Sequence, residues 1–574
     1  MGRILRYLKH YKIESVLGPL FKMLEALFEL FIPLLVADIV DVGIANGDSA
    51  FVLQRCAIMV LLGVVGLGAS VCAQYFSAKA AVGMASELRL ALFEKIGRLS
   101  YKDTDRFGTA TLLSRATSDV AQIQNAVNLV LRLFLRSPFI VFGAMIMAFT
   151  VSPSAARTFL VTIPALSVVI FGIMLVSIPL YGRVQARLDR LLTLIRENLR
   201  GARVVRAFVR EQESVQEFTE ANARLTSLQR FSARISALLN PLTYVIINLS
   251  VLAILYLGGV QVNSGTLETG EVIALYNYMS QILVELIKLA NFIILITKAC
   301  ACGKRINAVF DAPDGLPERE KKSNMSHNGV EFCHVSLCYN KGADETLTDI
   351  CLLAEPGQTV GVIGPTGSGK SSLVNLIPRL YDASDGVVLV GGVDVRDLAL
   401  DDLRGAIGIV PQHAELFAGS IRENLLWGDE HADDSVLYEA LRAAQALDFV
   451  LAGKGGLDAR VEQGGKNFSG GQRQRLTIAR ALVRRPRILI LDDSSSALDY
   501  ATDAALRAAI SALPYHPTVF IVSQRTASIE AADQILVLDD GVSVGCGTHQ
   551  ELLKCCEAYR EIYDSQFKGE GVSA

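Results

Sequence analysis

The strongest chemical signal in this sequence is a glycine-rich run at residues 364–371, Gly-Pro-Thr-Gly-Ser-Gly-Lys-Ser. A strand-like stretch, 358–363, precedes it and a helical pattern follows it, which is the setting that a phosphate-binding P-loop (Walker A sequence) requires. Glycines let backbone N–H groups turn around phosphate oxygens, and the helix N-terminus adds positive partial charge. In such a loop Lys370 reaches the β- and γ-phosphates and Ser371 ligates Mg²⁺. The run therefore predicts a nucleotide-binding site.

An apolar run at 488–492 supplies the second half of this site, because it predicts a buried strand that ends in Asp492. A carboxylate at that position holds Mg²⁺ in P-loop proteins. Buried strands often end in Asp, so the run gains its meaning only from the P-loop. The residues expected to surround the phosphates are Gly364, Pro365, Thr366, Gly367, Ser368, Gly369, Lys370, Ser371 and Ser372.

Four further segments make the chain resemble an ATP-binding cassette (ABC) transporter with six membrane spans fused to one nucleotide-binding domain. Phe-Ser-Gly-Gly-Gln at 468–472 resembles the LSGGQ signature of the family, and Gln412 resembles its Q-loop glutamine. Ser-Ala-Leu-Asp at 496–499 matches the D-loop, and Tyr339 stands where the family stacks an aromatic ring on adenine. The resemblance implies ATP and Mg²⁺ as cofactors. It adds to the expected ATP-contacting set Tyr339, Gln412, Ser469, Gly470, Gly471, Gln472 and Asp499.

The resemblance implies that Ser371, Gln412 and Asp492 are the Mg²⁺ ligands.

Two positions depart from the family pattern. The catalytic base of the family is a glutamate, whereas this chain has Asp493, whose carboxylate is one methylene short and positions the attacking water poorly. The switch residue of the family is a histidine, whereas this chain has Gln524, which forms hydrogen bonds but carries no proton or positive charge. Together these catalytic positions predict a site that binds ATP and hydrolyses it slowly.

The resemblance also implies a dimer, because each ATP site in the family joins one chain's P-loop to the other chain's signature. The signature is intact here, so it would complete a partner's site. We therefore predict one half of a heterodimeric multidrug or lipid exporter, with a degenerate site on this chain. The expected partner is a second, homologous half-transporter that has the catalytic Glu and the switch His. ATP hydrolysis is then coupled to transport mainly at the partner's site.

Three alternatives stay open at this stage. The same architecture serves some importers, for example for metal chelates. A homodimeric exporter with slow hydrolysis is the second. A regulatory or soluble ATP-binding protein without transport is the third, and the predicted membrane spans argue against it.

The elements that position these motifs are of two kinds, apolar membrane spans in the first half of the chain and the strands and helices of an α/β domain in the second. Hydrophobic residues make up 51% of the chain, mean hydropathy is +0.37, and this apolar excess lies in the first half. About 20 apolar residues cross the hydrocarbon core of a bilayer. Three runs carry no charge and three carry a few charges, which predicts six spans. They are 16–36, 56–76, 128–150, 158–182, 235–267 and 272–297.

Basic residues predict the orientation of the spans. The stretch 183–234 has 11 Arg, and 77–126 has seven Lys or Arg, whereas 261–271 has none. Both termini, the long loops and the nucleotide-binding domain are therefore expected in the cytoplasm of a multi-pass cell-membrane protein. Helical periodicity predicts that the spans continue into the long loops, with breaks at Gly108 and Gly201.

The domain organisation follows from a shift in composition. We expect an all-α transmembrane domain at 1–310, a linker at 311–328 that is rich in Pro, Gly and charge, and a cytosolic α/β P-loop domain at 329–574. Strands are expected at 358–363, 387–390, 407–410, 488–491, 518–522 and 535–538. A formal net charge of −3 gives no reason to expect a nucleic-acid partner; lipid and a small-molecule or lipid substrate are the expected ones.

Polar residues within the spans bear on the substrate. They are Glu25, Glu29, Gln281, Glu285, Lys288 and Asn291. A cavity for cationic substrates is one interpretation; the stronger one is that Glu285 and Lys288 pair at i, i+3. The ten cysteines predict reduced thiols without a zinc site, since neither Cys300-x-Cys302 nor Cys555–Cys556 comes with a second Cys or His pair.

Overall fold

A computed structural model describes residues 1–316, 325–339 and 345–567, apart from the side chains of residues 290, 291, 294 and 567. The middle of the expected linker, the side chain of Asn291 and the last seven residues of the expected nucleotide domain thus lie outside the described residues. The chain divides into two compact units, which are described separately. Unit 1 is Met1–Gly97 with Phe107–Ala312, and unit 2 is Arg98–Arg106 with Pro313–Ala574.

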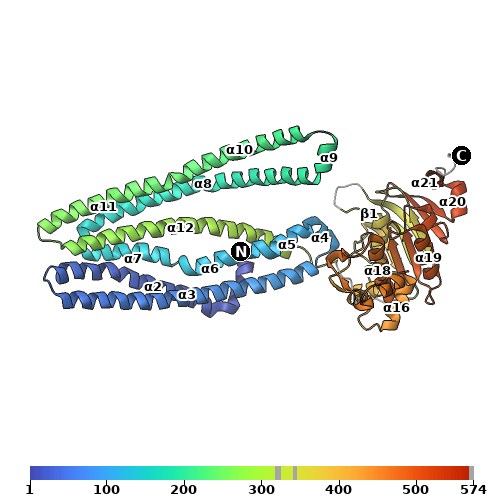
Figure 1. Ribbon diagram of the computed structural model, residues 1–574, viewed down its shortest axis with the longest axis horizontal. Coiled ribbons are helices and arrows are strands. Elements are labelled where there is room, and N and C mark those ends of the chain that lie inside the picture. The colour runs from blue at the N-terminus through green and yellow to red at the C-terminus, as the bar shows by residue number, and fades with distance from the viewer. Residues whose placement is uncertain (317–324, 340–344, 568–574) are drawn as a thin grey trace. The chain divides into compact units, whose positions relative to one another are not determined.

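Unit 1 is helical throughout its described secondary structure (Figure 1). Helices suit lipid because every backbone N–H and C=O finds a partner within the same segment. The helices are α1 (Gly2–Leu5), α2 (Lys12–Asp38), α3 (Ser49–Gly97), α5 (Thr109–Ser114), α6 (Val120–Leu133), α7 (Arg136–Val151), α8 (Pro153–Arg200), α9 (Ala202–Ala207), α10 (Glu211–Ala237), α11 (Leu239–Asn263) and α12 (Thr269–Phe310).

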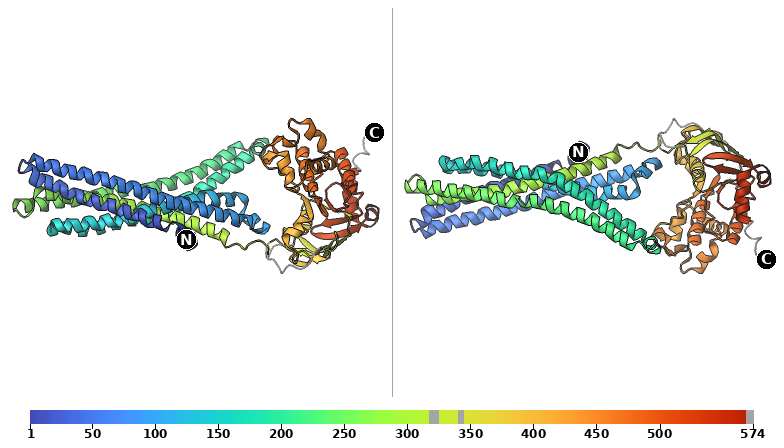
Figure 2. Two further views of the ribbon diagram at one scale, coloured as in Figure 1. Left: turned by 90° about the horizontal axis from the view of Figure 1, so that it is seen from below. Right: turned by 90° about the horizontal axis from the view of Figure 1, so that it is seen from above.

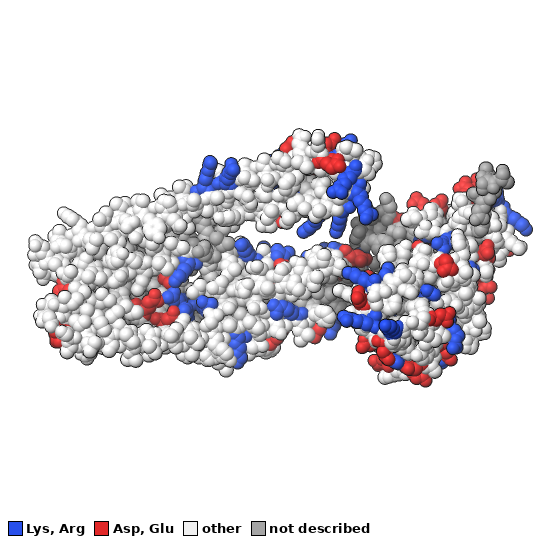
Figure 3. Space-filling model, in the orientation of Figure 1, with Lys and Arg blue, Asp and Glu red and all other residues white. Residues whose placement is uncertain are grey.

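Five stretches among the described residues are long and apolar enough to cross a membrane: Ser49–Gly97, Thr109–Val151, Pro153–Arg200, Glu211–Asn263 and Thr269–Leu289. The sixth expected span lies in α2, which has 27 residues but carries Lys22, Glu25 and Glu29. The helix is long enough to cross a bilayer, but it carries more charged residues than the apolar stretches of the other five. Figure 3 shows that much of the visible face of unit 1 has few charged side chains.

The long helices continue far beyond their apolar stretches. Ser152 caps α8 by accepting a hydrogen bond from the Ala155 amide, and α8 then runs for 48 residues before it ends at Gly201. The polar helix α10 lies beside α8 (Figures 1 and 2). Gly108, at φ +75°, separates α5 from the helix before it. Both predicted breaks are therefore confirmed.

Unit 2 is an α/β fold with two main sheets (Figure 1). The antiparallel sheet has the order β2-β1-β4-β5, with β1 (Val330–Leu337), β2 (Leu347–Ala354), β4 (Asp385–Val390) and β5 (Val393–Asp394). The mostly parallel sheet has the order β12-β11-β3-β10-β9-β6, with β3 (Thr359–Ile363), β6 (Ile407–Val410), β9 (Ile488–Asp492), β10 (Thr518–Val522), β11 (Gln534–Asp539) and β12 (Val542–Gly547). A small pair joins β7 (Gly419–Ser420) to β8 (Arg460–Val461).

The helices of unit 2 are short. They are α4 (Tyr101–Phe107, which ends one residue inside unit 1), α13 (Lys370–Leu376), α14 (Leu400–Gly405), α15 (Ile421–Leu426), α16 (Asp434–Ala443), α17 (Leu447–Ala452), α18 (Gly470–Val483), α19 (Tyr500–Ser511), α20 (His549–Cys555) and α21 (Glu557–Phe567).

The parallel sheet is buried on both faces, which explains its continuous apolar strands. In β9, Ile488 and Ile490 pack into one core, and Leu489 and Leu491 pack into the other. Strand β10 lies between β3 and β9, so the carboxyl ends of all three strands meet at one edge of the sheet. That edge carries the nucleotide motifs.

Candidate functional site

The phosphate loop connects β3 to α13, as the sequence predicts. Gly367 and Gly369 adopt φ near +90°, a conformation that costs glycine little. A Cβ on Gly369 would lie 2.7 Å from the Leu347 side chain, whereas one on Gly367 would meet nothing within 4 Å. The loop therefore packs against the domain on one side and is open on the other.

Lys370 folds back into this loop. Its Nζ donates to the carbonyl oxygens of Gly364 (2.8 Å) and Pro365 (2.6 Å). Burial lowers the pKa of the Lys370 ammonium, while Asp493 and Asp492 raise it. A nucleotide phosphate is an acceptor that suits this ammonium better than two neutral carbonyl oxygens, because an ionic hydrogen bond is stronger.

Ser371 and Asp492 face each other at the sheet edge. The Ser371 hydroxyl donates to Asp492 Oδ1 at 2.8 Å. Burial raises the pKa of Asp492, and the neighbouring Asp493 carboxylate adds to that shift. The Ser371 hydroxyl, the buried Asp492 carboxylate and the half-buried Asp493 carboxylate are oxygen donors with an excess of negative charge, which fits a Mg²⁺ site.

Asp493 occupies the position after the strand. Its backbone lies in the left-handed region at φ +46°, and its N–H donates to Val522 O in the neighbouring strand β10. The Gln412 amide donates to Asp493 Oδ2 at 3.3 Å. The structure thus brings Gln412, Asp492, Asp493 and Ser371 to one edge, although 121 residues separate Ser371 from Asp492.

Gln524 follows β10 and is exposed. Its backbone is fixed, because its carbonyl oxygen accepts from Gln566 Nε2 at 2.7 Å. The amide of Thr526 donates to the same Gln566 side chain, which belongs to α21. The side chain of Gln524 makes no hydrogen bond among the described residues. Position 524 is therefore held in place while its side chain is available.

The signature segment forms a complete helix start. Ser469 caps α18: its Oγ accepts from the Gln472 amide at 3.3 Å, and its own amide donates to Gln472 Oε1 at 2.9 Å. A Cβ on Gly471 would lie 3.1 Å from Ala497 O, so the signature adjoins the segment that ends in Asp499. Asp499 caps α19 by accepting from the Thr502 amide.

The structure separates the signature from the phosphate loop of the same chain. Within the described ranges, no hydrogen bond or ion pair joins residues 364–372 to residues 468–475. Of the predicted set, the loop, Gln412, Asp492, Asp493 and Tyr339 are therefore linked, and the signature and Asp499 form a second group.

Tyr339 joins the first group through α13. Its hydroxyl donates to Ser372 Oγ at 2.9 Å, and its ring meets the Tyr381 ring edge-on with centroids 4.9 Å apart. The Tyr381 hydroxyl donates to Asp105 Oδ2 at 2.5 Å, and this bond together with burial raises the pKa of Tyr381. Tyr381 and Asp105 were not predicted, because no spacing in the sequence relates either residue to Tyr339.

A second polar group lies in unit 1. Arg136, at the start of α7, pairs with Glu285 of α12 at 2.5 Å and with Glu29 of α2 at 2.7 Å. Glu285 also accepts from Ser137 (2.6 Å) and Lys288 (2.8 Å). The predicted pair of Glu285 and Lys288 is confirmed, but its main partner, Arg136, was missed. Three helices are thereby joined.

The charged group borders a pocket of about 360 Å³ in unit 1. Glu29, Gln281 and Lys288 line it, and Gln281 Oε1 is buried without a partner among the described residues. Glu25, the other acidic residue of α2, pairs with Lys22 instead. The pocket thus offers a carboxylate, an ammonium and an amide.

Comparison with known proteins covers nearly the whole chain. The family described as "ABC transporter transmembrane region" matches residues 15–286, and that described as "ABC transporter" matches residues 347–496. An uncharacterised ABC transporter ATP-binding protein of Mycobacterium tuberculosis is 38% identical over 98% of this chain and 97% of its own length. Another, from Bacillus subtilis, is 36% identical over 100% and 99%.

Two further matches extend the comparison. A Mycobacterium bovis protein described as a fatty acid ABC transporter ATP-binding/permease protein is 33% identical over 83% of this chain and 75% of its own length. The solved structure of a bacterial Atm1-family ABC exporter with ATP bound superposes with a TM-score of 0.79 over 98% of both chains at 22% identity. At that identity the structure supports the fold alone.

Proposed function

This chain belongs to the ABC transporters, and from that membership we propose that it is one half of a heterodimeric exporter with two unequal ATP sites. As a member it is a membrane-embedded transporter whose ATP-binding domain couples hydrolysis to transport. We place its termini and unit 2 in the cytoplasm, following the basic loops.

The observation that carries the proposal is the contrast between the two edges of unit 2. The signature segment has its full set of capping bonds through Ser469 and Gln472. The phosphate-loop edge presents Asp493, whose side chain is about 1.5 Å shorter than a glutamate, and Gln524, which cannot exchange a proton. This chain therefore combines an intact signature segment with a phosphate-loop edge that lacks the family's Glu and His. Such a chain suits a partner whose own phosphate-loop edge has both residues.

The proposed roles rest on family membership and are supported by the contacts described above. Lys370 binds terminal phosphate, Tyr339 stacks on adenine, and Ser371, Gln412 and Asp492 hold Mg²⁺. The shorter Asp493 carboxylate would accept a proton from the attacking water poorly, so ATP at this site would serve mainly as a ligand that favours closure. The signature residues Ser469 to Gln472 act on the ATP that the partner's P-loop holds.

The substrate we propose is an amphipathic small molecule or lipid with an ionisable head. The pocket beside Glu29 and Lys288 supports this, because apolar helices surround a few charged groups. The description of the Mycobacterium bovis relative as a fatty acid transporter supports the same class. Import through the same architecture is the second candidate, and transport in inverted vesicles decides the direction.

The decisive experiment compares two variants in a complex with a co-expressed homologous half-transporter that has the catalytic Glu and the switch His. We expect Gly470→Asp in the signature to reduce ATP turnover at least ~100-fold, because a carboxylate would meet the partner's bound phosphates. Lys370→Ala, which affects only this chain's own site, should reduce turnover by less than about threefold. Equal losses in the two variants, or rapid turnover by this chain alone, would overturn the proposal.

A further inference from the structure

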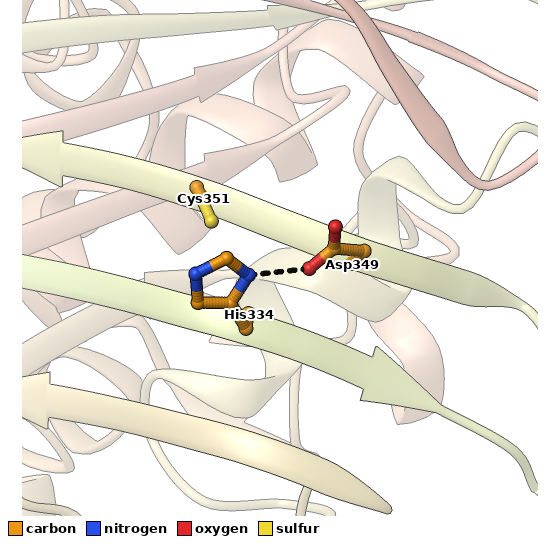
Figure 4. A group of neighbouring side chains, drawn as sticks. All are labelled: His334, Asp349 and Cys351. Atoms are coloured by element: carbon orange, nitrogen blue, oxygen red, sulfur yellow. Dashed lines mark hydrogen bonds and ion pairs between the residues drawn. The ribbon is translucent and has the colours of Figure 1, made fainter.

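The outer face of the antiparallel sheet gathers three side chains that can bind a metal. His334 of β1 lies beside Asp349 and Cys351 of β2, with His334 Nδ1 2.6 Å from Asp349 Oδ1. One ligand atom from each residue lies within 4.8 Å of the other two. Figure 4 shows the Cys351 sulfur and the Asp349 carboxylate both directed toward the imidazole ring. All three residues are exposed, on the face opposite the buried core.

A β-bulge creates this arrangement. Phe332 pairs with Leu352 and Val335 pairs with Ile350, so two residues of β1 stand opposite Cys351 alone. The extra residue allows Phe332 and Val335 both to point into the core although they are three positions apart in sequence. It also turns His334 outward, onto the face of Asp349 and Cys351.

The backbone is unusual at two of the three residues. His334 has φ +48° and Asp349 has φ +50°, in the left-handed region that non-glycine residues rarely adopt. The neighbouring strand accommodates the bulge with Gly386, where a Cβ would lie 2.1 Å from His334 O. The bulge, the positive φ angles and the close approach of Gly386 thus together direct His334 toward its neighbours on β2.

The donor set selects the metal. An imidazole nitrogen, a thiolate sulfur and a carboxylate oxygen together suit Zn²⁺, whereas Mg²⁺ and Ca²⁺ prefer oxygen alone. Ligand atoms of a tetrahedral zinc site lie about 3.3–3.8 Å apart, given bonds of 2.0–2.3 Å. The present separations run from 2.6 Å, between His334 Nδ1 and Asp349 Oδ1, to at most 4.8 Å, and exposed side chains reach the zinc spacing by rotation about their χ angles.

We propose that His334, Asp349 and Cys351 bind one Zn²⁺, with water as the fourth ligand, at a site distinct from the ATP site. The adjacent Cys333 is not a ligand, because its thiol is directed to Glu331 Oε1 at 3.4 Å. The bound ion cross-links β1 to β2 and stabilises this sheet. The site does not depend on the proposed heterodimer.

The test uses the reduced, metal-free full-length chain in detergent and titrates it with Co²⁺ as a spectroscopic probe for Zn²⁺. We expect one Co²⁺ per chain with tetrahedral visible bands and a thiolate-to-cobalt charge-transfer band, all displaced by Zn²⁺. Cys351→Ser should abolish the charge-transfer band, and His334→Ala should weaken Co²⁺ binding at least tenfold. Both changes are on the surface, so thermal unfolding of the metal-free protein should stay unchanged.

Cys333→Ser is the matched control, because it removes the neighbouring thiol from the same strand. We expect it to bind Co²⁺ like the wild type. Absence of a charge-transfer band in the wild type, an unchanged titration in Cys351→Ser, or loss of binding in Cys333→Ser would each overturn the assignment.

Discussion

The two groups of buried charges in this chain are stabilised in opposite ways. In unit 1, Arg136 lies between Glu285 and Glu29, so cation and anions neutralise one another. In unit 2, Lys370 bonds to neutral carbonyl and hydroxyl oxygens of its own loop, and Asp492 stands next to a second carboxylate. The charges of the first group are paired with one another inside the protein. The charges of the second group lack a hydrogen-bonded ionic partner among the described residues.

The two groups suit different tasks: paired buried charges hold helices together, whereas buried charges without an ionic partner can accept the charge of a ligand. A buried ion pair is costly to break because each partner would be left charged in a medium of low polarity. A buried charge without an ionic partner marks a place where a ligand can supply one. Removing a charge should therefore destabilise unit 1 and leave the ligand-free unit 2 unchanged or slightly more stable.

Arg136→Leu should have the largest effect on stability. It leaves Glu285, which is 3% exposed, without its main cation, and Glu29 without its partner. We expect a loss of about 3–5 kcal/mol, measured as thermal unfolding of the full chain in detergent. The control is Arg210→Leu, which breaks an exposed pair with Glu213 and should cost less than about 1 kcal/mol. Similar losses in both variants would show that burial is not the cause.

Lys370→Ala should leave the nucleotide-free chain nearly as stable as the wild type but abolish its stabilisation by ATP. At 100 times the dissociation constant, a ligand stabilises the folded state by about 2.7 kcal/mol. Thermal unfolding with and without Mg²⁺-ATP measures both quantities. Lys454→Ala, which removes an exposed lysine of the same unit, should keep the full ATP shift. A persistent shift in Lys370→Ala would contradict the proposed role of the loop.

Asp493→Glu combined with Gln524→His should raise ATP turnover by this chain about tenfold, which corresponds to about 1.4 kcal/mol. The longer carboxylate reaches the attacking water, and the imidazole can exchange a proton. Phosphate release in single- and multiple-turnover assays measures the change. Adding Lys370→Ala should cancel the gain. Turnover that stays at the original rate would mean that these two positions do not limit hydrolysis.

Asp492→Asn should have the smallest effect, and it should stabilise. Burial raises the pKa of Asp492, so the ionised form that prevails at neutral pH is less stable in the folded state than in the unfolded one. Asparagine keeps an acceptor for Ser371 without the charge. We expect about 1 kcal/mol, or ~2–4 °C in the melting temperature without nucleotide, together with loss of Mg²⁺-dependent ATP binding. The gain should shrink as pH falls, because the raised pKa lets the folded wild-type carboxyl take up a proton before the unfolded one does. A lower melting temperature in Asp492→Asn would contradict the expected stabilisation.

Much of the fold was predictable because its signals are local. The six expected strands, from 358–363 to 535–538, are confirmed, since each is a short apolar run between turn residues. Strands β1, β2 and β12 were missed because cysteine, histidine and glycine interrupt their apolar alternation. The bulge at His334 shifts the period of β1 by one residue, which no alternation pattern can represent.

The candidate sites differ in the same way. The loop at 364–371 and the capping box at Ser469 are contiguous, so their geometry follows from their own sequence. The ion pair of Arg136 with Glu285 joins residues 149 positions apart, and only helix packing determines which of the available acids meets the arginine.

The sequence by itself determined the membrane and nucleotide motifs, because glycine, charge and hydrophobic periodicity act over a few residues. Tertiary structure decided which distant groups share a site: Ser371 with Asp492, Tyr339 with Tyr381, and His334 with Cys351. The physical reason is that strand register and helix packing fix these distances through the summed burial of many apolar side chains, and no single residue encodes that sum.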